Sequence, residues 1–384
     1  MKRIYIIAAF LLGTASWADA QNNAGFLDKV RGVFTNKVSI GTCTLRDGGQ
    51  YTGEIQKRKP NGRGRTVYKN GDVYEGQYVK GKREGQGVYI LSDGEKYDGQ
   101  WVQDRQHGKG IYYFMNNNRY DGEWFEDYMH GKGIMYYHNG DSYEGGWEYD
   151  KRSGKGTYTW RDGSKYIGSW VDDRKDGFGI LEWSNGCRYE GDWKEDMRNG
   201  EGSFTYTNGE HYTGGWKDDL QHGKGVFDFG GDRYEGEYVM GMRTGEGTYF
   251  HANGDKYVGT FKDGMQDGKG TFTWATGAVY VGDWKSNKRE GKGKYTWTNG
   301  DTYDGEWLDN QPNGQGILVL SSGLKYRGGF VNGLEEGEGV QVDKDGNRYE
   351  GGFKAGKKHG AFIEKDKNGK VIREGVYEKG RLTK

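Results

Sequence analysis

Tyrosine, glycine and tryptophan recur along this chain with a fixed spacing. A Tyr (position 0) is followed by Gly at +2 and, in every unit but the first, by an aromatic residue at +4, and positions +1 and +3 are mostly polar. The spacing is 23 residues, except for one interval of 22 after Tyr212. The first Tyr of the fourteen units stands at 51, 74, 97, 120, 143, 166, 189, 212, 234, 257, 280, 303, 326 and 349. This period predicts a repeat architecture, and each unit is named below by the number of its first Tyr.

The first part of each unit has the pattern of a β-strand. Alternation from 0 to +4 predicts a strand with one aromatic face. Because Gly weakens a strand, the Gly at +2 indicates tight ring packing or close approach of backbones. Positions +5 to +10 are polar, as in Lys217 to His222, and predict a loop. Glycines at +11 and +13 predict a turn or a β-bulge after it.

The second part of each unit alternates again. Phe204 and Tyr206 are one example, and the segment ends in Asn208-Gly209. Asn-Gly between alternating segments is a strong signal for a β-hairpin. An isolated hairpin is marginally stable, so successive hairpins must pair edge to edge. The sequence therefore predicts an all-β fold, an elongated, twisted antiparallel β-meander solenoid on the order of 130 Å long.

Positions 0, +2 and +4 form the candidate structural core. Two interpretations remain open: a buried aromatic stripe, or a partly open aromatic groove that stacks on sugar rings or takes a peptide. In the units with the full Tyr, Gly and Trp set, the residues are Tyr97, Gly99, Trp101, Tyr120, Gly122, Trp124, Tyr143, Gly145, Trp147, Tyr166, Gly168, Trp170, Tyr189, Gly191, Trp193, Tyr212, Gly214, Trp216, Tyr280, Gly282, Trp284, Tyr303, Gly305 and Trp307.

The repeat resembles a known family. The segments "YDGEWFEDYMHGKG" from Tyr120 and "YEGGWEYDKRSGKG" from Tyr143 are similar to the MORN (membrane occupation and recognition nexus) repeat. The resemblance covers residues 51–371. It implies a groove-like β-meander and a scaffold or assembly role, with lipid association also attributed to the family. At +6 and +7, Asp-Asp or a similar pair often replaces Gly-Lys, which weakens the case for a basic row of loops that binds lipid.

Charge is balanced along most of the chain. The 56 basic and 56 acidic residues disfavour nucleic acid as a partner. The C-terminal end is an exception with a basic surplus. It is interpreted either as a solvated segment that protects the sheet edge or as a contact for an anionic surface. The candidate interaction tail comprises Lys354, Lys357, Lys358, Lys365, Lys367, Lys370 and Arg373.

The two ends differ from the repeats. Residues 1–20 have a charged start, a short apolar run and Ala18-Asp19-Ala20, which predicts a cleaved signal peptide and export to the periplasm or the exterior. The alternatives are an uncleaved anchor and, in a eukaryote, the lumen of an endomembrane compartment. Residues 21–50 are expected to form an N-terminal cap with a degenerate half-repeat, and residues 372–384 a basic tail with a partial repeat. Cys43 and Cys187 lie about six repeats apart, too far for a disulfide, so two unpaired thiols are expected.

No enzyme, metal site or cofactor is predicted. Histidines recur at +10, a repeat position, and a spacing of about 10 Å per repeat is too wide for one metal ion. The favoured hypothesis is a non-enzymatic exported scaffold that binds a protein partner or itself. The alternatives are a binder of membrane lipid or envelope polysaccharide, and an accessory subunit of an enzyme carried on a separate chain.

Overall fold

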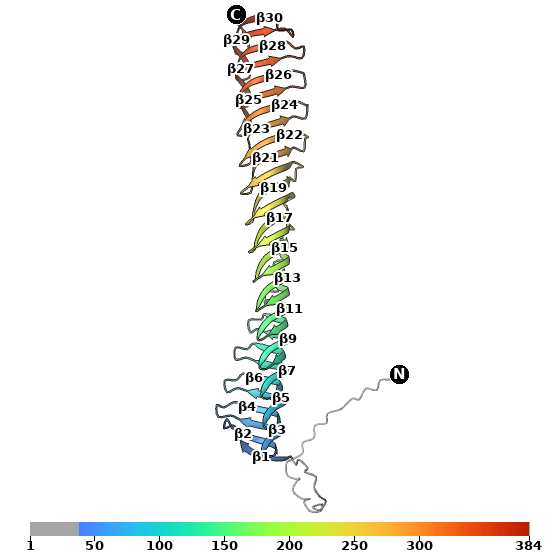
Figure 1. Cartoon of the computed structure of the whole chain (residues 1–384), viewed down its shortest axis with the longest axis vertical. Coiled ribbons are helices and arrows are strands. Elements are labelled where there is room, and N and C mark those ends of the chain that lie inside the picture. The colour runs from blue at the N-terminus through green and yellow to red at the C-terminus, as the bar shows by residue number, and fades with distance from the viewer. Residues whose placement is uncertain (1–37, 384) are drawn as a thin grey trace, which may run out of the picture.

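A computed structural model describes residues 38–383 as one antiparallel sheet of 31 strands. Each strand pairs with the strand before it and the strand after it in the chain, so the hairpins stack into a long column (Figure 1). The predicted all-β meander of repeated hairpins is therefore confirmed. The predicted signal peptide, 1–20, and the cap residues 21–37 lie outside the described residues.

The strands have regular lengths. They are β1 (Ser39–Thr44), β2 (Gln50–Gln56), β3 (Lys59–Val67), β4 (Val73–Val79), β5 (Lys82–Ile90), β6 (Lys96–Val102), β7 (Arg105–Tyr113), β8 (Arg119–Phe125), β9 (Tyr128–Tyr136), β10 (Ser142–Glu148), β11 (Lys151–Thr159), β12 (Lys165–Val171), β13 (Arg174–Glu182), β14 (Arg188–Lys194), β15 (Met197–Thr205), β16 (His211–Lys217), β17 (Leu220–Phe229), β18 (Asp232–Val239), β19 (Met242–Phe250), β20 (Lys256–Lys262), β21 (Met265–Thr273), β22 (Val279–Lys285), β23 (Lys288–Thr296), β24 (Thr302–Leu308), β25 (Gln311–Val319), β26 (Lys325–Val331), β27 (Leu334–Val342), β28 (Arg348–Lys354), β29 (Lys357–Lys365), β30 (Val371–Glu378) and β31 (Arg381–Leu382).

The turn within each unit is shorter than the sequence suggested. In unit 189 only Glu195 and Asp196 separate β14 from β15, with φ of 47° and 71°, which is typical of a type I′ hairpin turn. The predicted loop from +5 to +10 is therefore wrong. The strand resumes at +8, directly after the two turn residues, and Gly200, at +11 with φ of 94°, lies within it in a left-handed conformation. It belongs to a β-bulge, since the register shifts between Gly191 and Trp193.

The turn between units matches its prediction. Gly209 has φ of 85°, and its N–H donates to the carbonyl of Tyr206. The N–H of Tyr206 donates in turn to the carbonyl of Glu210. Strands β15 and β16 pair on either side of this turn. The Asn-Gly signal therefore identified a real hairpin turn.

Both ends of the column continue the repeat pattern. In β1, Gly41 lies opposite Gly53, as a +13 glycine lies opposite a +2 glycine. At the other end, Phe362 stands where every other unit has the +13 glycine, and it stacks on Tyr349 with ring centroids 5.4 Å apart. Strands β30 and β31 then extend the sheet as far as Leu382.

The core consists of aromatic rings that lie over glycines. Tyr143 is fully buried, and it contacts Trp147 of its own unit and Trp170 of the next edge to face, with centroids 5.2 and 5.3 Å apart. Its ring covers the paired Gly145 and Gly156, because a Cβ at either glycine would overlap it. Each Tyr thus joins two units, and a continuous aromatic ladder forms.

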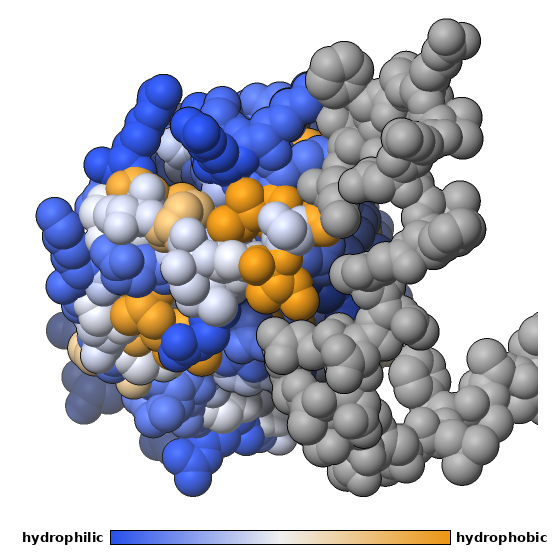
Figure 2. Space-filling model, turned by 90° about the horizontal axis from the view of Figure 1, so that it is seen from below, coloured by the Kyte–Doolittle hydropathy of each residue, from blue (hydrophilic) through white to orange (hydrophobic). Residues whose placement is uncertain are grey.

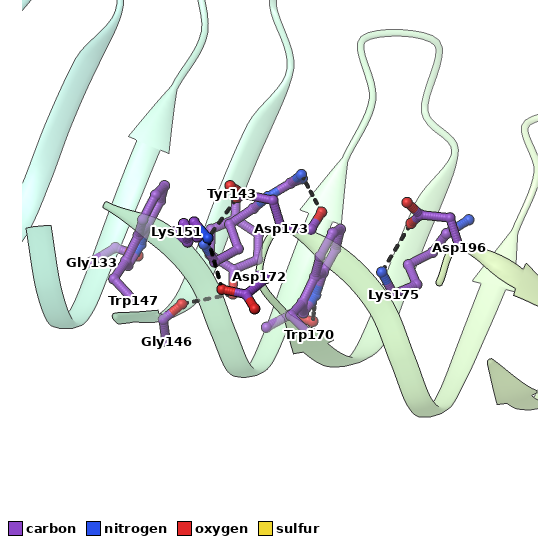
Figure 3. Close-up of polar contacts among 12 residues, drawn as sticks. Gly133, Tyr143, Gly146, Trp147, Lys151, Trp170, Asp172, Asp173, Lys175 and Asp196 are labelled. Carbon is purple, nitrogen blue, oxygen red and sulfur yellow. Dashed lines mark hydrogen bonds and ion pairs between the residues drawn. The ribbon is translucent and has the colours of Figure 1, made fainter. Parts of the chain in front are cut away.

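Hydrogen bonds fix the polar atoms of these rings. The Tyr143 hydroxyl donates to the carbonyl of Gly146 at 3.0 Å, and the Trp147 Nε1–H donates to Gly133 at 3.2 Å (Figure 3). A buried polar atom without a partner is costly. The Tyr hydroxyl bond recurs in every unit, and the indole bond recurs in each unit that has Trp at +4.

Candidate functional site

The sheet has two chemically different faces. Positions 0, +2, +4, +9, +13 and +15 form the aromatic face, which includes the candidate core residues. Positions +1, +3, +12 and +14 form the opposite face, called the groove face below. The two faces follow from strand alternation.

The aromatic face is closed. Its tyrosines at position 0 are at most 3% exposed, and the Trp residues at +4 at most 7%. Burial raises the pKa of the Tyr51 hydroxyl to about 12. The hypothesis of a partly open aromatic groove formed by these rings is therefore wrong.

Cationic side chains at +9 cover the tryptophans. The Arg152 guanidinium lies 4.2 Å from the Trp170 ring centroid, and the Lys175 ammonium lies 4.1 Å from that of Trp193. Burial lowers the pKa of Lys175. Such cation–π contacts are favourable when they are desolvated, so these residues close the core from the solvent side.

An aspartate at +7 ties each of these cations to the next unit. The Arg152 N–H and Nε–H both donate to Asp173 Oδ1 at 3.0 Å, and the Lys175 N–H donates to Asp196 Oδ1 at 2.9 Å. Figure 3 shows these aspartates at the hairpin tips, with Lys151 and Asp172 paired beside them. We call the contact of a +7 side chain with the +9 N–H of the preceding unit the tip staple.

The groove face is hollowed. A groove of about 920 Å³ lies over units 97–166, and its floor is formed by the backbone of the +2 and +13 glycines. A second groove of about 910 Å³ lies over the C-terminal units, between Gln315 and Ile363. Because glycine has no side chain, the floor lies at the level of the backbone. Side chains at +1, +3, +12 and +14 rise above it and form the walls. This face can therefore receive an elongated ligand.

The walls of the first groove change along its length. Lys109, Lys132 and Lys155 occupy +12 in three successive units, across from acidic residues at +1 or +3. In unit 166, Phe178 replaces the lysine and Ile167 replaces the acidic residue. The candidate residues predicted from the sequence do not include these positions. Position +1 was expected only to be polar, and +12 had no predicted role. The signal was present as a break in the repeat pattern.

The candidate interaction tail is part of the sheet. Lys354 ends β28, Lys357 to Lys365 lie in β29, and Arg373 lies in β30. Three of its cations have partners: Lys365 pairs with Glu350, and Lys358 and Arg373 pair with Glu364. Lys358 also lies 3.9 Å from the centroid of the Tyr349 ring. Lys367 and Lys370 lie in the connection between β29 and β30.

The described residues were also searched for disulfides, membrane-spanning helices and metal sites. Cys43 and Cys187 are free and half-buried. Residues 38–383 contain no helix that is long and apolar enough to span a membrane. In this range no three His, Cys, Asp or Glu side chains gather closely enough to hold a metal ion. Viewed from its N-terminal end, the column has a mainly hydrophilic surface with small apolar patches (Figure 2).

The repeat identifies the class of protein. The MORN repeat model matches fourteen consecutive segments between residues 51 and 361, from 51–73 to 349–361. The chain belongs to the MORN repeat family, whose repeats are a non-enzymatic type that suggests a protein-interaction scaffold. No curated protein matches this chain.

Two solved structures are similar in part. The TCP10 domain of CPAP from Danio rerio is 14% identical, with a TM-score of 0.27, and covers 52% of this chain and 99% of its own. The SAS-4 (dCPAP) TCP domain of Drosophila melanogaster, in complex with a proline-rich motif of Ana2, is 13% identical, with a TM-score of 0.27. It covers 50% of this chain and 99% of its own. Neither likeness is close enough to inform function.

Proposed function

We propose that this chain is a non-enzymatic, exported scaffold that holds a protein partner on its groove face. The observation that carries the proposal is the glycine-floored groove of about 920 Å³ over units 97–166. It offers lysines, carboxylates and apolar side chains along one line. A face of this kind suits a segment of another protein better than a small molecule, because the groove is long and open.

The alternatives have less support. Stacking of polysaccharide on the Tyr and Trp rows would need exposed rings, and those rings are buried. Electrostatic binding to an anionic membrane needs clustered free cations. Here three of the seven tail cations, Lys358, Lys365 and Arg373, are engaged with carboxylates, which leaves four lysines for such a contact. An accessory role beside an enzyme on another chain is a special case of the scaffold.

A photo-crosslinking experiment in the native host tests the groove as the binding face. A photoreactive residue at Thr157 lies in the groove, and one at Arg161 lies in an exposed turn between units of the same region. We expect a discrete crosslinked protein, identified by mass spectrometry, from position 157 and none from position 161. Equal products from both positions, or none from 157, would refute the groove.

Export has its own test. The proposal places the mature N-terminus at Gln21, after Ala18-Asp19-Ala20. Fractionation followed by N-terminal sequencing should find a chain that begins at Gln21 outside the cytoplasm. A chain that keeps residues 1–20 in the cytoplasmic fraction would contradict export and leave the groove proposal standing.

A further inference from the structure

One unit interrupts the charged walls of the groove with apolar side chains. In unit 143 the +1 and +12 positions are Glu144 and Lys155, whereas unit 166 has Ile167 and Phe178. These two side chains are 46% and 49% exposed. The apolar notch, as we call it, consists of Ile167, Phe178 and the half-buried Ile180, which pairs with Ile167 across β12 and β13. Grouped exposed apolar residues inside a polar groove are typical of an anchor site for a partner.

Beyond the notch, where the groove of about 920 Å³ ends, the same face continues with free carboxylates and with a smaller hollow of about 460 Å³ over units 212 and 234. Glu201 is the +12 residue of unit 189, and Glu237 and Glu246 are the +3 and +12 residues of unit 234. All three are exposed. Within residues 38–383 none of their carboxylates makes an ion pair or a side-chain hydrogen bond. Unpaired carboxylates attract the cationic groups of a ligand, and here Lys224 separates Glu201 from Glu246.

The groove is on a sheet face, and this limits the conformation of its ligand. The backbone groups of the floor are already paired between strands, as Gly168 is with Gly156 and Gly179. An added β-strand needs a free sheet edge, whereas a polyproline-II segment needs no backbone ladder. A segment that lies across the strands in the polyproline-II conformation therefore fits this face.

The length of the repeat favours the same conformation. Two strands advance each unit by roughly 10 Å along the column. One turn of polyproline II has three residues and rises about 9.3 Å. A side chain on every third residue would thus point into the groove once per repeat. In a β-strand, residues three apart point to opposite faces and would miss every second unit.

We infer that the groove face, from the apolar notch to unit 234, binds a polyproline-II segment of the partner with one turn per repeat. An apolar residue of this segment, at position i, occupies the apolar notch. Lys or Arg at i+3 lies opposite Glu201, and Lys or Arg at i+9 lies opposite Glu246. The residue at i+6 faces Lys224 and carries no positive charge. This inference rests on the proposed function, because it names the chemistry of the segment that the scaffold holds.

Two synthetic peptides of equal composition test the register. Both are proline-rich and fluorescently labelled, with leucine at i. One has arginine at i+3 and i+9, and the other has arginine at i+4 and i+8. We expect fluorescence anisotropy with the full mature chain to show at least tenfold tighter binding of the first peptide. Equal binding of the two, or binding of neither, would overturn the inference.

Variants that copy neighbouring units test the residues with little risk to folding. Phe178→Lys and Glu201→Lys install the +12 residue of units 143 and 212, which are Lys155 and Lys224. Each should weaken binding of the in-register peptide at least tenfold. The control Glu338→Lys makes the same change at +12 of unit 326, outside this part of the groove, and should leave binding unchanged.

Exchanging the charges of the peptide and the chain shows whether Glu201→Lys weakens binding through its charge or because it disturbs the fold. A peptide with glutamate in place of the arginine at i+3 should bind Glu201→Lys better than it binds the unchanged chain. If it does not, the register is wrong. If the peptides fail while the crosslink from position 157 still forms, the scaffold proposal survives and only the polyproline-II inference is lost.

Discussion

The hairpin tips of units 97–212 differ from those of units 234–349 at position +7. In the first region the residue is Asp104, Asp127, Asp150, Asp173, Asp196 or Asp219, and in the second Gly241, Gly264, Asn287, Asn310, Gly333 or Gly356. Every aspartate accepts the +9 N–H of the preceding unit. The two asparagines do the same, and the glycines have no side chain with which to do it.

The difference shows what the fold requires and what it does not. The +7 N–H donates to the +9 carbonyl in both regions, as Asp173 does to Arg152 at 3.1 Å and Gly264 does to Arg243 at 3.0 Å. The aromatic ladder also runs through both regions. Units can therefore stack without the tip staple. The staple adds a second tie in the region that also carries the apolar notch, so this part of the groove is held more firmly.

The largest expected difference between the two regions is the pH at which their buried tyrosines ionise. Burial raises the pKa of Tyr326 and Tyr349 to about 12, and raises that of Tyr143 and Tyr166 still further. An unfolded tyrosine titrates near pH 10, so the stabilisation is complete below about pH 10 and is lost as the pH rises through the folded pKa. Burial raises the pKa of Tyr234, in the same region, to about 12 as well. We therefore expect Tyr234, Tyr326 and Tyr349 to ionise first on alkaline titration, before the column unfolds, and the tyrosines of units 97–212 to ionise at higher pH.

Two optical signals can distinguish these steps. Units 326 and 349 have Phe330 and Phe353 and no tryptophan. Tyrosinate absorbance should therefore begin to rise before tryptophan fluorescence changes. Simultaneous change of both signals near pH 10 would contradict the protection of the core tyrosines.

Adding a methyl group to a core glycine should cost the same in both regions. A Cβ at Gly179 would overlap Tyr166, and one at Gly293 would overlap Tyr280. Overpacking of this kind costs about 3 kcal/mol. Chemical denaturation of Gly179→Ala and Gly293→Ala should show similar losses, with Thr157→Ala on the groove face as a nearly neutral control. A large loss in only one region would show that the ladder is not equivalent in the two.

Exchanging the +7 residues should have the smallest effect and should differ in sign. Asp173→Gly removes the acceptor of the Arg152 N–H and is expected to cost about 1 kcal/mol, the usual net value of a hydrogen bond. Gly264→Asp should add about half as much stability, because Arg243 then gains a staple. Thermal denaturation of both variants measures this exchange. If neither variant changes the midpoint, the staple does not distinguish the regions.

Much of the fold could be predicted because it depends on local alternation. The spacing of Tyr143, Gly145 and Trp147 indicated a strand with an aromatic face, and Asn208-Gly209 indicated a hairpin turn. The turn at Glu195-Asp196 could not be found in this way. Glu195 is a weak turn former, and Asp196 is not followed by the glycine that marks an Asp-Gly hairpin turn. The positive φ of both residues is found in the hairpin itself.

The sequence alone determined the period, the hairpin unit and the residues that make the ladder, since these follow from side-chain alternation along single strands. Only the tertiary structure decided which face is closed and which is hollow. The +9 cations fold over the tryptophans of the following unit, and the groove walls come from units that are adjacent only after stacking. Contacts between units depend on the curvature of the stacked sheet, and no single 23-residue repeat contains that information.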